Sequence, residues 1–151
     1  MTDQPEIYPM PSFAMLRVAD LGASARWYQE ALGFQHIFTM PGPGGVPGLV
    51  HLRWVKYADL LITGRDAPEG PRGGGVSLHF SAYLAGRTVD AIAAQATAAG
   101  ATIVAPPATM PWNARECTIA DPDGYRLVFT EPVDIGRSFD SVLRAVAEPA
   151  P

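Results

Sequence analysis

The stretch FAMLRVADLGASARWYQEALGF, residues 13–34, contains a strand pattern followed directly by a helix pattern. Over residues 12–18 the side chains alternate between an apolar set and a mixed set, which is typical of a strand with one buried face. Residues 21–32 are expected to form a helix, because Asp20 can cap its first turn and Gly33 can end it in the left-handed conformation. This stretch therefore predicts a β-strand joined by a short turn to an α-helix.

The same order of elements occurs twice along the chain. The first half continues with strands expected at 35–40, 49–55 and 58–63. The second half repeats the order, with a strand at 76–82, a helix at 88–99 between Thr88 and Gly100, and strands at 101–105, 115–120 and 125–131. The sequence thus predicts an α+β protein with two βαβββ modules, whose curved mixed sheets surround a cleft and carry the helices on the convex face.

Proline and glycine mark the division between the two halves. Residues 65–75 are rich in both and are expected to be a linker. The first module is accordingly placed at 12–64 and the second at 76–132. Residues 133–151 are assigned to a C-terminal helix and tail, with the helix itself expected at 136–147.

Charge and composition exclude several classes of partner. The chain has 151 residues and a formal net charge of −4 with no basic run, which argues against nucleic acid and acidic membranes. Neither a signal peptide nor a long apolar segment is visible, so a cytoplasmic location is expected. Cys117 is the single cysteine and allows no intramolecular disulfide. It is interpreted as a buried strand residue, with a catalytic thiol as the alternative.

The alternation in four of the strands separates an apolar set from a mixed set of side chains. The apolar set is expected to face the helices, and the mixed set to line the opposite face, as a cleft or an interface. The mixed set comprises Phe13, Met15, Arg17, Asp59, Leu61, Thr63, Ser77, His79, Ser81, Arg126, Val128 and Thr130.

An ordered series of short motifs resembles the vicinal oxygen chelate superfamily, which includes glyoxalases, bleomycin-resistance proteins and dioxygenases. The resemblance extends over roughly residues 12–132 and implies paired βαβββ modules that each form half of a cleft. The motifs are MLRVADL (15–21) with Ser24, WY (27–28), LGF (32–34), AAGA (98–101), PW (111–112), RE (115–116), DPDGY (121–125) and FTEP (129–132).

The resemblance also locates the four positions at which enzymes of this superfamily hold a metal. Here they are Phe13, Leu61, Ser77 and Val128. Three of these side chains have no lone pair for a metal, and a lone serine hydroxyl is a poor ligand. The protein is therefore expected to be metal-free and without a cofactor, as in the bleomycin-resistance-like branch, and to purify without stoichiometric metal.

Without a metal, the affinity for a ligand must come from burial and aromatic contact. For Trp54 and Phe38, packing in the core is weighed as the alternative to ligand contact. Trp27 and Tyr28 are assigned to the core. Arg17 is expected either to bind an anion or to pair with Asp59. The candidate ligand-binding residues are Phe13, Arg17, Phe38, Met40, His51, Trp54, Tyr57, Ser77, His79, Met110 and Trp112.

The leading hypothesis is a non-enzymatic binding protein that confers resistance by sequestering a toxic natural product, bleomycin-like or polycyclic and aromatic. The resemblance implies a homodimer. One alternative is a glyoxalase- or dioxygenase-type enzyme with an atypical site, in which a histidine acts as a metal ligand or as an acid or base. The other is a sensor or an accessory protein that carries a biosynthetic intermediate.

Overall fold

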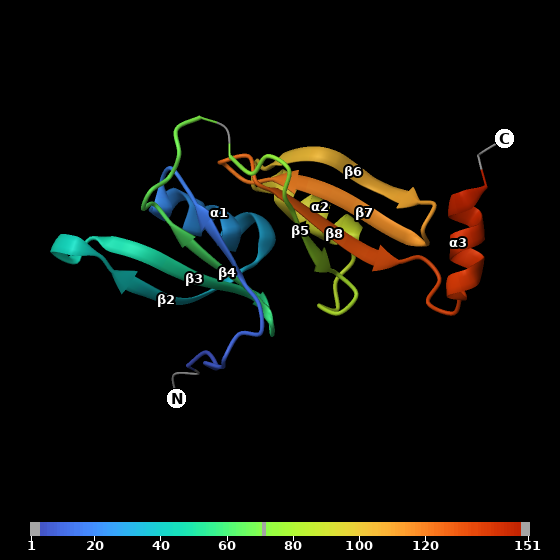
Figure 1. Cartoon of the computed structure of the whole chain (residues 1–151), viewed down its shortest axis with the longest axis horizontal. Helices are drawn as coiled ribbons and strands as arrows, with labels where there is room; N and C mark the ends of the chain where they lie inside the picture. Colours follow the sequence, from blue (N-terminus) through green and yellow to red (C-terminus); the bar gives the residue numbers. More distant parts are fainter. Residues whose placement is uncertain (1–3, 71, 149–151) are drawn as a thin grey trace. The chain divides into compact units, whose positions relative to one another are not determined.

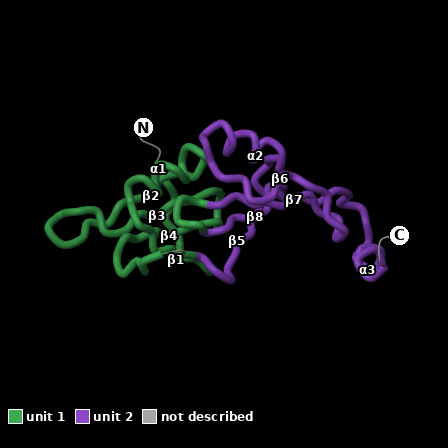
Figure 2. The backbone as a smooth tube through the Cα atoms, turned by 90° about the horizontal axis from the view of Figure 1, so that it is seen from above, with its two compact units in different colours: residues 1–72, 121–124 green, residues 73–120, 125–151 purple. Residues whose placement is uncertain are grey.

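The computed structural model describes residues 4–70 and 72–148. The chain forms two compact units, which Figure 2 distinguishes by colour. One unit comprises the chain up to Arg72 together with the turn Asp121–Gly124, and the other comprises Gly73–Ala120 and the chain from Tyr125 onward. Each unit has its own sheet and its own helix against that sheet, so each is described by itself.

The first unit has the βαβββ order expected from the sequence (Figure 1). Its strands pair in the order β1-β4-β3-β2, with β1 parallel to β4 and the other pairs antiparallel. Helix α1 packs against β2, β3 and β4. The elements are β1 (Ala14–Arg17), α1 (Leu21–Leu32), β2 (Gln35–Pro41), a short 3₁₀ turn η1 (Pro43–Gly45), β3 (Pro47–Val55) and β4 (Ala58–Thr63).

The second unit repeats this topology. Its sheet has the order β5-β8-β7-β6, again with one parallel pair, β5 with β8. Helix α2 packs against β6, β7 and β8. The elements are β5 (Ser77–Ser81), α2 (Val89–Ala98), β6 (Thr102–Met110), β7 (Ala114–Ala120) and β8 (Arg126–Pro132). The α+β fold with two βαβββ modules is confirmed.

Both helices begin and end where the sequence predicts. The Asp20 side chain accepts a hydrogen bond from the backbone N–H of Ala23 at 2.9 Å, and the Thr88 hydroxyl does the same for α2. Gly33 adopts φ = 76° and thereby ends α1, and Gly100, at φ = 81°, follows α2. Each cap satisfies a backbone donor that the first turn leaves without a partner.

The apolar set of strand residues packs under the helices, as predicted, with differences at the strand ends. Val76 precedes β5 and is 61% exposed, and Ala14 and Leu78 are only partly buried. On α2 the side chains of Val89, Ile92, Ala93 and Ala96, which recur at helical spacing, are all buried against the sheet. The largest buried apolar side chains are Val18, Tyr28, Leu32, Leu52 and Ile62 in the first unit and Val89, Ile92, Ile119, Leu127 and Phe129 in the second.

Strand β6 is longer than the sequence indicates. A strand is expected only to residue 105, because Pro106 and Pro107 lack the backbone N–H that a ladder needs. The structure continues the strand to Met110, with an irregular register between Ala105 and Ala108. This is permitted because β6 lies at the edge of its sheet, where prolines and bulges are tolerated.

A third helix, α3 (Phe139–Ala147), follows the second sheet and is capped by Ser138. It begins three residues later than the predicted 136–147, and none of its residues is buried. Its apolar side chains Phe139, Leu143 and Val146 are at least half exposed. Among the described residues, no helix combines the length and the apolarity needed to cross a membrane.

Two glycine-to-alanine substitutions in and beside α1 are expected to have opposite effects on stability. Gly33→Ala places a side chain at φ = 76° and should destabilise the protein by about 1–2 kcal/mol. Gly22→Ala adds a Cβ with ordinary contacts of 3.6 and 3.8 Å and should stabilise it by about 0.5 kcal/mol. Urea denaturation of both variants measures the two changes, and equal signs would contradict the assigned end of α1.

Candidate functional site

The face of the first sheet that α1 does not cover presents a mixed set of aromatic, sulfur-containing and charged side chains. Strand register aligns Met15 with Leu61, Leu61 with His51, and His51 with Phe38, so these four form a row across the sheet. A second row runs through Arg17, Thr63, Leu49 and Met40. A third contains Asp59, Arg53 and Gln35. These three rows are called the open face below.

Five of the residues predicted from the sequence lie on the open face or beside it. Phe13 precedes β1 and is exposed, as is Arg17 at the other end of that strand. Phe38 and Met40 are 38% and 50% exposed, and the Phe38 ring meets the His51 ring edge-on at a centroid distance of 5.3 Å. The structure therefore brings together predicted ligand residues from three strands.

A pocket of about 550 Å³ opens beside the second row of the open face. Its wall includes Met15 and Met40, so two flexible thioether side chains shape it. In the β2–β3 hairpin that forms its rim, Gly42 and Gly48 approach so closely that a Cβ on Gly48 would lie 3.1 Å from the Gly42 Cα. The remaining lining residues are Leu21, Pro41, Pro43, Val46, Pro47, Leu49, Thr63, Gly64 and Arg65.

A buried charged cluster centred on Asp59 joins the third row to His51 of the first row. One carboxylate oxygen accepts hydrogen bonds from His51 Nε2 at 2.8 Å and from Arg53 Nε at 2.7 Å. The other oxygen accepts from the Tyr8 hydroxyl at 2.6 Å. All three strand residues of this cluster are less than a tenth exposed. A buried carboxylate of this kind is tolerated only because its charge is paired and its lone pairs are used.

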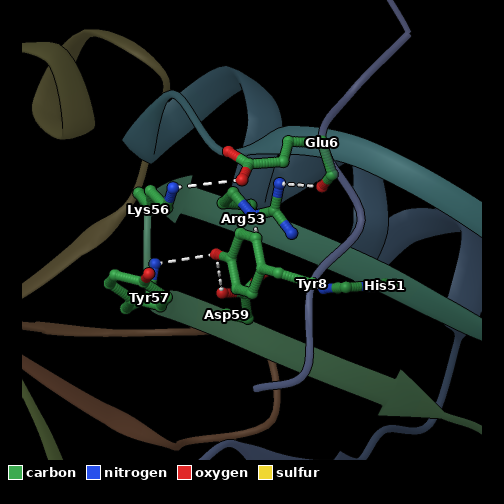
Figure 3. A network of polar contacts seen from close by, with 7 residues as sticks. All are labelled: Glu6, Tyr8, His51, Arg53, Lys56, Tyr57 and Asp59. Carbon is green, nitrogen blue, oxygen red and sulfur yellow. Dashed lines mark hydrogen bonds and ion pairs between the residues drawn. The ribbon is translucent and has the colours of Figure 1, made fainter. Parts of the chain in front are cut away.

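The N-terminal arm, residues 4–8, lies against this cluster and was not expected to be part of a site. Figure 3 shows the Tyr8 ring beside Asp59, Arg53 and Tyr57. Arg53 Nη1 donates to the backbone carbonyl of Glu6 at 2.6 Å, and Lys56 pairs with the Glu6 carboxylate at 3.0 Å (Figure 3). Period-two alternation already placed Asp59 in the mixed set and could have added Arg53, but no local pattern in the sequence indicates where Tyr8 docks.

The cluster fixes the protonation of Asp59 and Tyr8. Burial by itself raises the pKa of the Asp59 carboxyl, but hydrogen bonds from Tyr8, His51 and Arg53 outweigh burial and hold this pKa below its ordinary value. Burial and the hydrogen bond to Asp59 raise the pKa of the Tyr8 phenol. At neutral pH the carboxylate is therefore ionised and the phenol is protonated.

Two expectations about the first unit need correction. Trp54 lies on the helix-covered face, because it alternates with His51 and Arg53 on β3; it is buried, and its indole N–H donates to the Leu32 carbonyl at 3.0 Å. Arg17 pairs in register with Thr63, four residues along β4 from Asp59. That separation is about 13 Å in a strand, too far for the expected ion pair.

The remaining predicted residues lie in or beside the second unit's sheet or in the β3–β4 turn. Ser77 and His79 are exposed on β5, with Ser77 Oγ and His79 Nε2 2.9 Å apart. Met110 ends β6, and Trp112, in the following turn, donates its indole N–H to Glu116. Tyr57 lies in the β3–β4 turn with φ = 68° and contacts Tyr8.

Cys117 lies buried on β7, as expected of a core residue. Burial raises the pKa of its thiol to about 11. The thiol is therefore protonated at neutral pH, whereas a nucleophilic cysteine acts as the thiolate. This environment favours the structural interpretation over the catalytic one.

Most of the chain matches one known protein family. Residues 11–129 match the family described as the Glyoxalase/Bleomycin resistance protein/Dioxygenase superfamily. The chain belongs to this superfamily. Among curated proteins, it is 38% identical over 98 residues to "Putative glyoxylase CFP32" of Mycobacterium tuberculosis, a match that covers 65% of this chain. The chain spans about a third of that relative's length, since the match covers 34% of it.

Solved structures share the fold at lower sequence identity. TioX from Micromonospora sp. ML1 superposes with a TM-score of 0.61 at 22% identity, covering 80% of this chain and 96% of TioX. A glyoxalase/bleomycin resistance protein from Streptomyces sp. CB03234 superposes with a TM-score of 0.60 at 24% identity, covering 78% and 96% of the two chains. These similarities establish the fold alone.

The residues at the superfamily's four metal positions do not fit a metal in this member. In the first unit, Phe13 and Leu61 carry no donor atom; in the second, Val128 carries none, and the Ser77 hydroxyl is hydrogen-bonded to His79. Within the described part of the chain, no three His, Cys, Asp or Glu side chains are grouped to hold a metal.

The depressed pKa of Asp59 predicts how stability responds to acid. A carboxyl whose pKa is lower in the folded state stabilises the protein fully above its unfolded value, about pH 4, and loses this contribution as pH falls through the folded value. The stability advantage of the wild type over Asp59→Asn should be constant near neutrality and decline below about pH 4. Urea midpoints measured from pH 7 to pH 2.5 test this, and an advantage that grows with acidity would contradict it.

Proposed function

We propose that this protein binds a small aromatic natural product on the open face of its first unit and sequesters it without altering it chemically. The observation that carries the proposal is the pocket of about 550 Å³ lined by Met15 and Met40. Phe38 lies two residues before Met40 on the same face of β2. A volume of that size lies within the range of about 300–1,000 Å³ typical of sites for drug-sized ligands. The cytoplasmic location expected from the sequence is part of this proposal.

The side chains around the pocket suit an irregular apolar ligand. Phe38 and Met40 are partly exposed although apolar, so covering them with a ligand removes apolar surface from water. Methionine adapts to uneven shapes, and an aromatic ring adds a directional contact. A flat polycyclic compound or a bleomycin-like molecule with aromatic groups meets these requirements.

Sequestration, and not turnover, is supported by the chemistry of the side chains. The superfamily's metal positions hold Phe13, Leu61, Ser77 and Val128, which cannot bind the metal that its glyoxalases and dioxygenases use. The buried thiol of Cys117 is protonated at neutral pH. The names of similar structures, which include a glyoxalase/bleomycin resistance protein, agree with a resistance role.

One observation favours an enzyme as the second candidate. His51 Nε2 lies 2.8 Å from a buried carboxylate oxygen of Asp59, and a carboxylate that orients a histidine is a frequent arrangement in acid–base catalysis. Arg53 binds the same oxygen, however, so this carboxylate is already engaged in an ion pair. The relative named a glyoxylase also agrees with this alternative.

Sequestration predicts stoichiometric protection and intact recovery of the ligand. A polycyclic aromatic antibiotic that binds should be incubated with an equal concentration of protein, the protein denatured, and the compound assayed by mass spectrometry and for toxicity. We expect one molecule of compound to bind per site. After release, the compound should be chemically unchanged and fully toxic. A chemically modified compound among the material recovered after denaturation would support the enzymatic alternative instead.

A variant locates the site in the same experiment. Phe38→Ala removes the aromatic contact and should weaken binding by about 1–3 kcal/mol, a factor of roughly 5–150. Tyr83→Ala is the matched control, because Tyr83 is also an exposed aromatic residue but lies in the second unit, after β5. Equal losses in both variants would place the ligand elsewhere.

We also propose that the protein is a homodimer, as expected from the resemblance of its sequence to this superfamily. The exposed apolar residues of α3, with Phe139 at 73% exposure, support this because such surface is usually covered in an assembly. Sedimentation equilibrium should yield twice the mass of the 16.1 kDa chain at micromolar concentration. A monomer at that concentration would contradict the proposal.

A further inference from the structure

The ring of Tyr8 occupies a small aromatic site built by three other residues of the first unit. The Arg53 guanidinium carbon lies 4.2 Å from the centroid of the ring, close enough for a cation–π contact. The Tyr57 ring meets the Tyr8 ring edge-on with centroids 5.0 Å apart. Asp59 lies at the hydroxyl end (Figure 3). A flat ring is therefore held at its face, at its edge and at its polar tip.

The tip of this site recognises a hydroxyl group in particular. The Tyr8 hydroxyl donates to Asp59 Oδ2 at 2.6 Å and accepts from the backbone N–H of Tyr57 at 2.7 Å (Figure 3). An ether oxygen at this point could not donate to Asp59, and an anionic oxygen would be repelled by the carboxylate. A neutral hydroxyl, which donates and accepts at once, satisfies both partners.

Arg53 retains a hydrogen-bonding capacity that Tyr8 does not use. Its Nη2 is buried and has no hydrogen-bond acceptor among the described residues, and the residue as a whole is only 7% exposed. Buried donors without acceptors are uncommon in folded proteins. A ligand ring with a carbonyl or hydroxyl oxygen beside it could supply the missing acceptor, which a tyrosine ring cannot.

The segment that carries Tyr8 is held to the site by few contacts. Residues 4–8 have no helix or strand, and Ile7 beside Tyr8 is 71% exposed. Among the described residues, the polar contacts of the arm with the sheet come from Glu6 and Tyr8, and the Glu6–Lys56 pair is exposed and therefore weak. An arm of this kind can be displaced without disturbing the helix-facing core.

We propose that Tyr8 is an internal stand-in for the ligand, and that its site is a subsite for a neutral hydroxyaromatic ring. The ligand displaces the N-terminal arm, donates its hydroxyl proton to Asp59 in a hydrogen bond, and places its ring on Arg53. This inference rests on the proposed function and specifies its ligand as a phenol-containing aromatic compound. The third row of the open face thus supplies polar recognition at Asp59, four residues along β4 from Thr63, which lines the apolar pocket.

The test uses full-length protein and two probes of nearly equal size, 2-naphthol and 2-methoxynaphthalene, which lacks the hydroxyl donor. Tyr8→Ala should bind 2-naphthol at least tenfold more tightly than the wild type, because the arm no longer competes. In Tyr8→Ala, 2-methoxynaphthalene should bind about tenfold more weakly than 2-naphthol, since a hydrogen bond to a charged acceptor is lost. The Tyr57 amide resonance should shift on 2-naphthol binding, because its acceptor is restored.

Ile7→Ala is the matched control on the same arm and should bind like the wild type. Should Tyr8→Ala fail to fold, Tyr8→Phe retains the ring and loses both hydroxyl hydrogen bonds, so 2-naphthol should bind it more tightly than the wild type. Equal affinity of the wild type and the Tyr8 variants for 2-naphthol, or equal affinity of a Tyr8 variant for the two probes, would overturn the inference.

Phe38→Ala separates this inference from the proposed function. The proposed aromatic contact at Phe38 predicts that Phe38→Ala weakens both probes, whether or not they carry a hydroxyl. If Phe38→Ala weakens binding but the Tyr8 variants bind 2-naphthol like the wild type, the phenol subsite is contradicted and the proposed contact at Phe38 is retained. If the Tyr8 variants bind 2-naphthol more tightly but Phe38→Ala has no effect, the subsite is supported and the proposed contact at Phe38 is contradicted.

Discussion

The buried carboxylate of Asp59 organises the open face of the first unit. An ionised group with so little exposure must have its charge and lone pairs matched, and Arg53, His51 and Tyr8 supply that match. This requirement determines which side chains stand at two positions on the same face of β3, His51 and Arg53. It also draws the N-terminal arm onto the sheet, because the second carboxylate oxygen finds its donor in Tyr8. The arm, the cluster and the aromatic site are thus consequences of one buried charge.

The two units have the same topology but different uncovered faces. In the first, β3 and β4 place His51, Arg53 and Asp59 together, and a pocket opens along the next rows. In the second, the corresponding face of β5 carries Ser77 and His79, both exposed and hydrogen-bonded to each other. The repeated βαβββ pattern therefore provides the scaffold twice, while the side chains of the mixed set give each face its own chemistry.

Membership of the superfamily sets the scaffold without setting the reaction. Its metal enzymes depend on donor side chains at four positions, and this chain has Phe13, Leu61, Ser77 and Val128 there. In the proposed function and subsite, an apolar pocket and the donor–acceptor pair formed by Asp59 and the Tyr57 N–H take the place of metal binding. The pocket would bury an aromatic ligand, and the pair would select its hydroxyl group.

The sequence by itself determined the elements of the fold, since their signals are local. Asp20 and Gly33 mark the ends of α1 through the first-turn donor and the left-handed stop, and period-two alternation separates the two faces of each sheet. Side-chain chemistry singled out Phe38, Met40, His51 and Trp54 as candidates, but it could not tell that Trp54 faces α1 while His51 faces the opposite side of β3. Strand register, which involves residues far apart in the chain, decided that Arg17 lies beside Thr63 and away from Asp59. The docking of Tyr8, 51 residues from Asp59, was decided by tertiary structure alone, because the buried carboxylate needs a donor and no pattern within the arm specifies one.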